Sequence, residues 1–418
     1  MNARIHRELD SSATTKNAIR FPVETVFYLA LVFTCPLFAQ EAAPQPAAAE
    51  MRQEQLQSVT PAAQPGATAA TPAPLTVAKS SPANDAARYL AGLPPVPGSP
   101  LTTLSQDSRW GAHARAMNLA FSQLEQRQLN NIRIFRSENV APVTQASRIC
   151  VYLFSGPDFL YADAMFGDCS TFVLQGLEPV DPIPDLLTTS PAALHGTLEN
   201  IQISLNTLLS FSFFKTKNMR EDFERAQLKG VLPIIFVFMA RTGKEIDSVE
   251  YISLDKEGKV QQGQQGSIRG AKINFVDPAS GAMKAMYYFT SDLSDDALKR
   301  NPALLRFCEG LGPANSLLKA ASYLLHGGNF TTARNFLLQN SVSVLQDDSG
   351  IPVHYFTPDK WILRFFGTYS GPIELFKNYN QPDLRQFYEA SSPKRLTFGF
   401  GYKWNNRSST LFLAVRKN

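Results

Sequence analysis

The residues of this 418-residue chain best placed to do chemistry are carboxylates near predicted strand ends. Asp158 closes the turn Ser155-Gly156-Pro157-Asp158, and Asp163 and Glu178 follow closely along the chain. Carboxylates that meet in a fold can ligate a divalent metal ion or serve as general acid and base. We therefore predict Asp158 as a catalytic residue, and Asp158, Asp163 and Glu178 as candidate ligands of a divalent metal.

A second pair of carboxylates, Asp347 and Asp348, lies in the segment LQDDSGIP, after a strand-like run. We predict both as catalytic residues if the fold brings them to Asp158. A structural role is the alternative for each group. Asp158 and Ser155 are of the types that cap helices, and Asp, Ser, Gly and Pro are the usual residues of turns.

Four residues are candidates for ligand binding. Ser155 and Glu178 each follow the carboxyl end of a predicted strand, which is where open α/β sheets bind their ligands. Lys215 and Arg220 belong to the cationic run FKTKNMR at the start of a predicted helix, which is a favourable place for an anion. Solvation of a charged surface is the alternative for these two cations.

The elements that position the first carboxylates form a strand, a short helix and a second strand. Ile149 to Phe154 is apolar and β-rich, Phe159 to Phe166 is helical in pattern, and Thr171 to Leu174 is again strand-like. This order predicts two parallel strands joined by a crossover helix. Such a unit places Ser155 to Asp158 and Glu178 at the same edge of a sheet.

The remainder of the body combines further helices with alternating strands. Val231 to Met239 is predicted as a buried central strand, and Leu317 to Leu325 as part of a helix. Alternation from Ile246 to Phe289 predicts an antiparallel extension of the sheet. Leu396 to Trp404 and Leu411 to Val415 predict a closing hairpin. The fold class is therefore mixed α/β, with flanking helices.

Three cysteines follow the N-terminal segment. Cys150 and Cys169 precede or begin the two strands of the predicted unit, so a disulfide between them is one expectation. Its loop of about 20 residues would stabilise the fold by roughly 3 kcal/mol. The alternative is three buried free thiols, with Cys308 packed on a helix. No pair of His or Cys residues has the spacing of a zinc site.

The N-terminal residues differ from the rest in composition. Basic residues precede an apolar run from Thr25 to Ala39, which is typical of a secretory signal and short for a membrane span. An uncleaved anchor and lipidation at Cys35 are alternatives. Residues 40–100 are rich in Ala and Pro and predict a disordered tether. Residues 101–418 are then the globular body.

Several phrases of the body are distinctive, including FSGPDFLYADAMF, GLEP, GVLPIIFVFMARTG, ASYLLH and LQDDSGIP. They resemble those of a family of uncharacterised secreted bacterial proteins, over most of Arg148 to Tyr402. The resemblance implies export from the cell. It brings no activity, cofactor or site residue with it.

These observations predict an exported bacterial protein, periplasmic or associated with the cell envelope, with a binding or structural role. An envelope protein or a glycan is the expected partner. The net charge is only +4 and no basic run is interleaved with aromatics, so nucleic acid is not expected. The alternatives are a carboxylate-based hydrolase, with a divalent metal as its cofactor, and an outer-membrane component.

Overall fold

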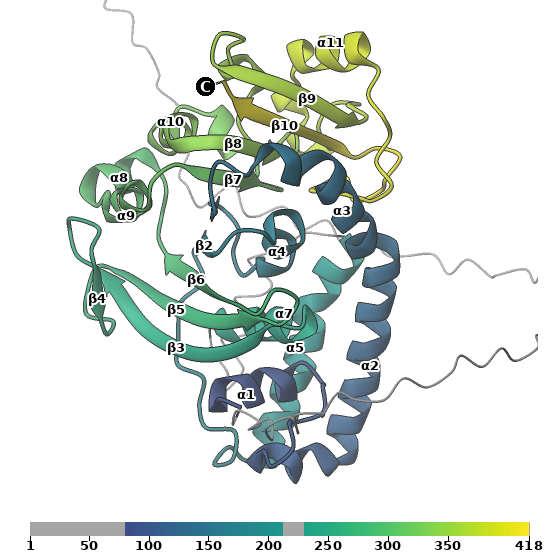
Figure 1. Ribbon diagram of the computed structural model, residues 1–418, viewed down its shortest axis with the longest axis vertical. Helices are drawn as coiled ribbons and strands as arrows, with labels where there is room; N and C mark the ends of the chain where they lie inside the picture. The colour runs from purple at the N-terminus through teal and green to yellow at the C-terminus, as the bar shows by residue number, and fades with distance from the viewer. Residues whose placement is uncertain (1–79, 212–229, 418) are drawn as a thin grey trace, which may run out of the picture. The chain divides into compact units, whose positions relative to one another are not determined.

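The computed structural model describes residues 80–211 and 230–417 (Figure 1). The predicted signal, most of the predicted tether, Lys215 and Arg220 lie outside these residues. Within the described ranges, no helix has the length and apolar character needed to cross a membrane. The helices are α1 (Pro82–Leu90), α2 (Ser108–Leu124), α3 (Asn130–Phe135), α4 (Phe159–Phe166), α5 (Pro191–Phe211), α7 (Leu232–Arg241), α8 (Asp295–Arg300), α9 (Ala303–Leu311), α10 (Thr331–Asn340) and α11 (Pro382–Ser391).

Ten strands form one mixed sheet in the order β4-β3-β5-β6-β2-β1-β7-β8-β10-β9. The strands are β1 (Ile149–Tyr152), β2 (Thr171–Gly176), β3 (Glu245–Leu254), β4 (Val260–Gln262), β5 (Ile268–Asp277), β6 (Ala282–Thr290), β7 (Ala314–Leu318), β8 (Ser341–Gln346), β9 (Trp361–Gly367) and β10 (Thr410–Arg416). The five central strands, from β6 to β8, are parallel to one another. Antiparallel strands extend the sheet at both sides. The predicted mixed α/β class and antiparallel extension are confirmed.

The predicted strand–helix–strand unit is confirmed as β1, α4 and β2. Its strands are parallel, with Ile149 opposite Thr171 and Tyr152 opposite Leu174. Side chains along β1 alternate between two hydrophobic cores, as the period of a strand requires. Cys150 and Tyr152 belong to one core, whereas Val151 belongs to the other. Both faces of β1 are therefore covered by helices.

The two cores divide the helices between the faces of the sheet. Apolar residues of α1, α2, α3, α4, α5 and α7 belong to the first core, and those of α8, α9, α10 and α11 to the second. Among the five parallel strands, the chain visits β1, β2 and β6 in one direction, then returns to β7 and β8 on the other side of β1. The spatial order is thus third-second-first-fourth-fifth, which is a doubly wound sheet with its switch point between β1 and β7.

The predicted strand at Val231 to Met239 is wrong, because these residues form helix α7. All residues from Leu232 to Ala240 are buried, so the helix has no polar face to reveal its period. Pro233 suits the first turn of a helix, where its missing N–H is not needed. A buried helix and a buried strand give the same continuous apolar run.

Two other predicted elements differ from the structure. Leu317 to Leu325 is the end of strand β7 followed by a turn and a short 3₁₀ helix, Leu324–His326. The predicted hairpin is absent as well: within Leu396 to Trp404 the structure has only an isolated bridge between Phe400 and Lys403. Strand β10 pairs instead with β8 and β9.

The predicted tether ends earlier than residue 100. Helix α1 packs against α7 and β3, and its Tyr89 and Leu90 are buried. Trp110 Nε1 donates a hydrogen bond to Tyr89 O at 3.0 Å, and Ile246 N donates to Asn84 Oδ1 at 3.0 Å. The composition of this stretch is low in aromatics, but its Tyr89 and Leu90 both enter the core. The folded part therefore begins by residue 82.

Candidate functional site

The carboxyl ends of the central parallel strands gather most of the predicted site residues. Asp158 follows β1, Glu178 follows β2, and Asp347 and Asp348 follow β8, all of them buried. Lys319, directly after β7, lies among them and is 3% exposed. A lysine and four carboxylates are therefore held at one edge of the sheet, which we call the carboxyl edge.

Asp158 combines the predicted capping role with a role in this charged cluster. Its Oδ1 accepts a hydrogen bond from Tyr161 N at 3.1 Å, which caps helix α4. Its Oδ2 lies 2.6 Å from Lys319 Nζ and accepts a hydrogen bond from the Tyr152 hydroxyl at 3.0 Å. A capping aspartate that is also buried and ion-paired holds the start of α4 to the end of β7.

Lys319 is the central cation of the carboxyl edge, and the sequence analysis did not single it out. Its Nζ lies 3.5 Å from the centroid of the Tyr161 ring, within cation–π range. Burial lowers the pKa of Lys319, whereas the nearby Asp158 and Asp347 raise it. The one signal in the sequence was a lysine placed between the apolar runs of β7 and Ala320-Ala321.

Asp347 is tied to the loop after β7 and to its own turn. It accepts hydrogen bonds from Ala320 N at 3.2 Å, Ser349 Oγ at 2.6 Å and Ser349 N at 3.1 Å. Burial, together with the neighbouring charge of Asp348, raises the pKa of Asp347 to about 7. This carboxyl can therefore exchange a proton near neutral pH, which is what a general acid or base requires.

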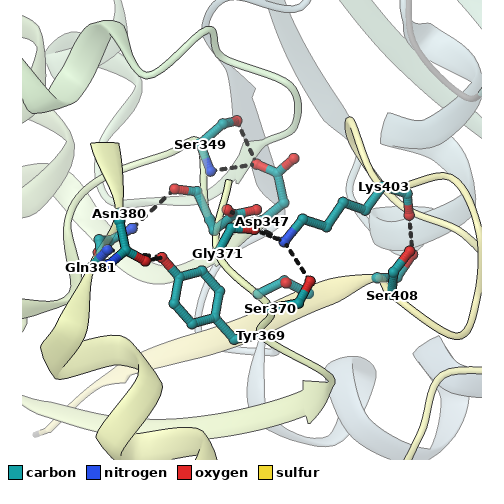
Figure 2. A network of polar contacts seen from close by, with 12 residues as sticks. Asp347, Ser349, Tyr369, Ser370, Gly371, Asn380, Gln381, Lys403 and Ser408 are labelled. Carbon is teal, nitrogen blue, oxygen red and sulfur yellow. Dashed lines mark hydrogen bonds and ion pairs between the residues drawn. The ribbon is translucent and has the colours of Figure 1, made fainter. Parts of the chain in front are cut away.

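Asp348 points to a different set of partners, among them Lys403, whose contact with Gly371 Figure 2 shows. Its Oδ2 accepts a hydrogen bond from the Tyr323 hydroxyl at 2.7 Å and lies 3.9 Å from Lys403 Nζ. Burial raises the pKa of Asp348, and Lys403 opposes that rise. Lys403 also donates to the carbonyl of Gly371. Asp348 thus ties the loop after β8 to the C-terminal loops.

Glu178 lies at the end of β2, against the turn that follows β1. Its Oε2 accepts a hydrogen bond from the Tyr288 hydroxyl at 2.9 Å, and its carbonyl accepts from Thr290 Oγ1 at 2.7 Å. Ser155, the other predicted binding residue of this region, joins the same two strands. Its Oγ donates to Gln175 O at 3.1 Å and accepts from Gln175 N at 3.1 Å. Ser155 therefore joins the turn after β1 to the end of β2, and its role in binding stays a prediction.

Asp163 does not join the carboxyl edge. Its Oδ1 lies 3.2 Å from Lys244 Nζ, which is also 3.2 Å from Asp277 Oδ1. Lys284, near the amino end of β6, pairs with Asp277 at 2.7 Å. Because Asp163 points to the opposite edge, the predicted metal set of Asp158, Asp163 and Glu178 is not assembled. In the described ranges, no three His, Cys, Asp or Glu side chains are placed to hold a metal ion.

The cysteines do not form the Cys150–Cys169 disulfide and match the alternative of three buried free thiols. Cys150, Cys169 and Cys308 are free thiols, and all three are buried. Burial raises the pKa of Cys169 to about 11 and that of Cys308 to about 12. Thiols with such high pKa values carry little thiolate at neutral pH, so they are poor nucleophiles.

Backbone strain is concentrated in the loops on either side of the switch point. Phe154 after β1 has φ of 63°, and Ala320, Ser322 and Tyr323 after β7 have φ of 52°, 53° and 56°. Elsewhere in the described residues, Ser392 is the one further non-glycine residue with positive φ. Left-handed backbone costs such residues about 1–2 kcal/mol each. Two adjacent loops of the carboxyl edge are therefore held in strained conformations.

Ser322 lies on this strained turn. Its Oγ lies 2.7 Å from the Tyr402 hydroxyl, which in turn donates a hydrogen bond to Ala320 O at 3.0 Å. Because the Tyr402 hydroxyl donates to Ala320 O, it accepts the hydrogen bond from Ser322. These bonds join the strained turn after β7 to Tyr402.

A groove lies beside the carboxyl ends of β2 and β6. It has a volume of about 290 Å³, and its lining includes Leu177, Thr290 and Ser291. Glu178 is the next residue after Leu177, and Thr290 is bonded to its carbonyl. The volume is at the lower end of the range of small-molecule sites. The carboxyl edge thus has an open depression beside it, at the ends of β2 and β6.

Comparison of the chain with protein-family models, with curated proteins and with solved structures gives no match. The function must therefore be argued from the geometry of the carboxyl edge. That geometry offers a buried ion pair, a carboxyl that can exchange a proton near pH 7, and a carboxylate at the end of β2. Asp158 and Asp347 both act on Lys319, but they do so inside the protein, away from the open groove.

Proposed function

We propose that this α/β domain binds a small polar ligand at the carboxyl edge, over the ends of β1, β2 and β7. The observation that carries the proposal is the strain in the two loops beside the switch point. Open α/β sheets bind ligands at this position. Strained backbone persists only where the surrounding structure enforces it, and it clusters at ligand sites.

The packing around Lys319 supplies that enforcement. The Lys319–Asp158 ion pair and the hydrogen bond from Ala320 N to Asp347 hold the loop after β7 from both sides. The strained loops are therefore preorganised, which reduces the entropy that ligand binding must overcome. Lys319, Asp158 and Asp347 position the loops in this proposal, and the ligand contacts the strained loops.

The test compares two glycine substitutions that relieve the same kind of strain in different places. Ala320→Gly removes a left-handed alanine at the carboxyl edge, and Ser392→Gly removes a left-handed serine at the end of α11. Both variants are screened by thermal unfolding against sugars, nucleosides, nucleotides, amino acids and divalent metal ions. A ligand that binds the native state raises the unfolding midpoint.

We expect to find a ligand that raises the unfolding midpoint of the wild type and of Ser392→Gly equally. The same ligand should bind Ala320→Gly with a Kd at least ~10-fold higher. The proposal fails if no compound in the screen binds the wild type. It also fails if Ala320→Gly binds every ligand as tightly as Ser392→Gly does.

An acid–base enzyme, such as the predicted hydrolase, is the second candidate. The observation that favours it is the pKa of about 7 for Asp347, because carboxyls with strongly perturbed pKa values are found preferentially at functional sites. A hydrolysis rate whose pH dependence fits the titration of one group with a pKa near 7 would identify this activity. That rate should be lost in Asp347→Asn.

We also propose that the protein is exported and works in the periplasm or at the cell envelope. The basic residues and apolar run before Ala39 support export, and so does the resemblance to secreted proteins. Export is tested by fractionating cells and measuring the molecular mass of the protein in each fraction. A periplasmic or envelope form that lacks about 39 N-terminal residues is expected. An unprocessed protein in the cytoplasm would disprove export.

A further inference from the structure

A second groove lies at the carboxyl end of β9. It has a volume of about 330 Å³, at the lower end of the range of small-molecule sites. Three segments line it: the last residue of β9 with the two residues after it, helix α11, and the chain that follows this helix. Its charged lining residues are Arg385, Glu389 and Arg395, and none of its lining residues belongs to the strained loops after β1 and β7.

Two contacts fix the lining segments to the sheet. The Tyr388 hydroxyl of α11 lies 2.9 Å from Leu411 O on β10, so the helix is held against the strands. Beyond the helix, Gly367 N at the end of β9 donates a hydrogen bond to Lys394 O at 2.8 Å. Arg395 therefore follows directly after a residue whose backbone is bonded to β9.

Arg385 is half-buried, and an aromatic ring holds its guanidinium group. Its Cζ lies 5.6 Å from the centroid of the Tyr369 ring, within cation–π range. The hydroxyl of this tyrosine is used elsewhere, since it accepts a hydrogen bond from Gln381 N at 2.8 Å and donates to Asn380 Oδ1 at 3.3 Å (Figure 2). A guanidinium group that lies over a ring still has its N–H donors available for a carboxylate.

The three charged side chains of this groove are not paired with one another. Within residues 80–211 and 230–417, the side chains of Arg385, Glu389 and Arg395 make no hydrogen bond and no ion pair. Arg385 and Glu389 are four residues apart on α11, so they lie on the same face of the helix. Two cations and one anion therefore line the groove with their hydrogen-bonding capacity unused.

The end of α11 adds negative charge at the same place. The helix ends at Ser391, and Ser392 after it lines the groove. Carbonyl groups at the C-terminus of a helix carry partial negative charge and attract cations. In the described part of the chain, the carbonyls of Glu389, Ala390 and Ser391 accept no hydrogen bond. The groove thus combines two guanidinium groups with an acidic side, which is formed by Glu389 and the helix end.

We infer that this groove binds a free α-amino acid. The carboxylate of the ligand accepts hydrogen bonds from Arg385 and Arg395, because guanidinium groups bind carboxylates through paired N–H donors. The ammonium group of the ligand lies beside Glu389 and the end of α11. A phosphate or a simple carboxylate would satisfy the arginines but would meet like charge on the acidic side. The groove is separate from the ligand site over β1, β2 and β7, so this inference goes beyond the proposed function.

The test measures the binding of the common amino acids to the full protein by isothermal titration. The amino acid that binds most tightly is compared with its amide, which lacks the carboxylate, and with its N-acetyl form, which lacks the ammonium group. We expect each derivative to bind at least ~10-fold more weakly, because hydrogen bonds to a charged group are lost. The inference is wrong if no amino acid binds, or if either derivative binds as tightly as its parent.

Two variants and a matched control assign the binding to the groove. Arg385→Gln should bind the amino acid at least ~10-fold more weakly. Glu389→Gln should reduce the preference for the amino acid over its N-acetyl form. Arg364→Gln on β9 is the control, because it removes the same charge from an exposed residue that does not line the groove. Equal affinities for Arg385→Gln and Arg364→Gln would overturn the inference, and the comparison of probes on the wild type needs no variant.

Ala320→Gly separates this groove from the proposed ligand site. The affinity for the amino acid should be unchanged in that variant, which alters only the loop after β7. If the affinity falls in Ala320→Gly and not in Arg385→Gln, the amino acid binds at the carboxyl edge; the inference is then wrong and the proposed function stands. If the amino acid binds as expected and no compound responds to Ala320→Gly, the inference stands and the proposed function is wrong.

Discussion

At the scale of single residues, the buried pair of Lys319 and Asp158 is the contact most sensitive to substitution. Removing one partner of a buried ion pair leaves an uncompensated charge and costs about 3–5 kcal/mol. We predict a loss of that size in the free energy of unfolding for Lys319→Met, measured by urea denaturation. The double variant with Asp158→Asn should recover part of it, since it leaves no buried charge unpaired.

The outcome also measures how much of Asp158 is a helix cap. A cap alone contributes about 1 kcal/mol. If Lys319→Met costs no more than that, the pair with Asp158 contributes little to stability. The cap itself was predictable from the sequence, because Asp158 precedes a helical pattern. Its partner was not, because a lysine between apolar residues gives no indication of which carboxylate it will meet in the fold.

Asp347 leads to a prediction about pH. Its pKa is raised in the folded protein to about 7, so between pH 4 and pH 7 the native state binds more protons than the unfolded chain. Stability from this group is therefore present at low pH and is lost as the pH rises to 7. His326 acts in the opposite direction, since burial lowers its pKa to about 4.

The difference between the wild type and Asp347→Asn removes the contribution of distant titrating groups. We predict that, between pH 4 and pH 7, urea denaturation shows the wild type losing stability relative to the variant. Parallel pH profiles for the two proteins would contradict a raised pKa. Because Asp347 and Asp348 influence each other's titration, the difference in slope reports on the pair.

At the scale of elements, the contact between β2 and the turn after β1 requires a glycine. We predict that Gly176→Ala destabilises the protein by about 1–3 kcal/mol or more, since the new methyl group overlaps Glu178 and Tyr288. Gly196→Ala on helix α5 is the control. A Cβ there meets no atom within 4 Å, and alanine favours a helix by up to about 1 kcal/mol.

Urea denaturation of both variants measures the contrast. Similar unfolding free energies for Gly176→Ala and Gly196→Ala would show that the edge of β2 can relax to admit a side chain. In that case the close approach of Gly156 to Glu178 would not be a fixed property of the site.

The elements around the site were the most predictable part of the chain. β1, α4 and β2 were identified because turn residues at Ser155 to Asp158 separate a β-rich run from a helical one. The α7 helix was mistaken for a strand because its residues from Leu232 to Ala240 are all buried. The hairpin at Leu396 to Trp404 was predicted from local alternation, whereas β10 obtains both its partners from distant parts of the chain.

At the scale of the whole molecule, helix α1 belongs to the folded unit. We predict that a chain beginning at residue 101 unfolds at a lower temperature than one beginning at residue 80. The loss should be about 3 kcal/mol or more, because Tyr89 and Leu90 are buried and a large buried side chain contributes about 1.5–3 kcal/mol. Chains that begin at residues 40 and 80 should have the same midpoint.

Equal thermal midpoints for the chains beginning at residues 80 and 101 would mean that α1 contributes nothing to the stability of the domain. The limit of the fold could not be found from composition, since Pro82–Leu90 resembles the Ala-rich residues before it. The class of the fold could be found, because it depends on the order of strand and helix patterns. The carboxyl ends of β7 and β8 lie at the same edge of the sheet as that of β1 because β7 pairs with β1 and β8 pairs with β7. Local sequence patterns do not encode such long-range pairing.

The place of β10 in the sheet has a consequence for how the protein is made. Strand β9 contacts the sheet through β10, which lies between β8 and β9 and is synthesised after both. This side of the sheet stays open, with unpaired backbone on β8, until residues 410–416 have been added. The chain therefore completes this side of its sheet only after residues 410–416 have left the ribosome.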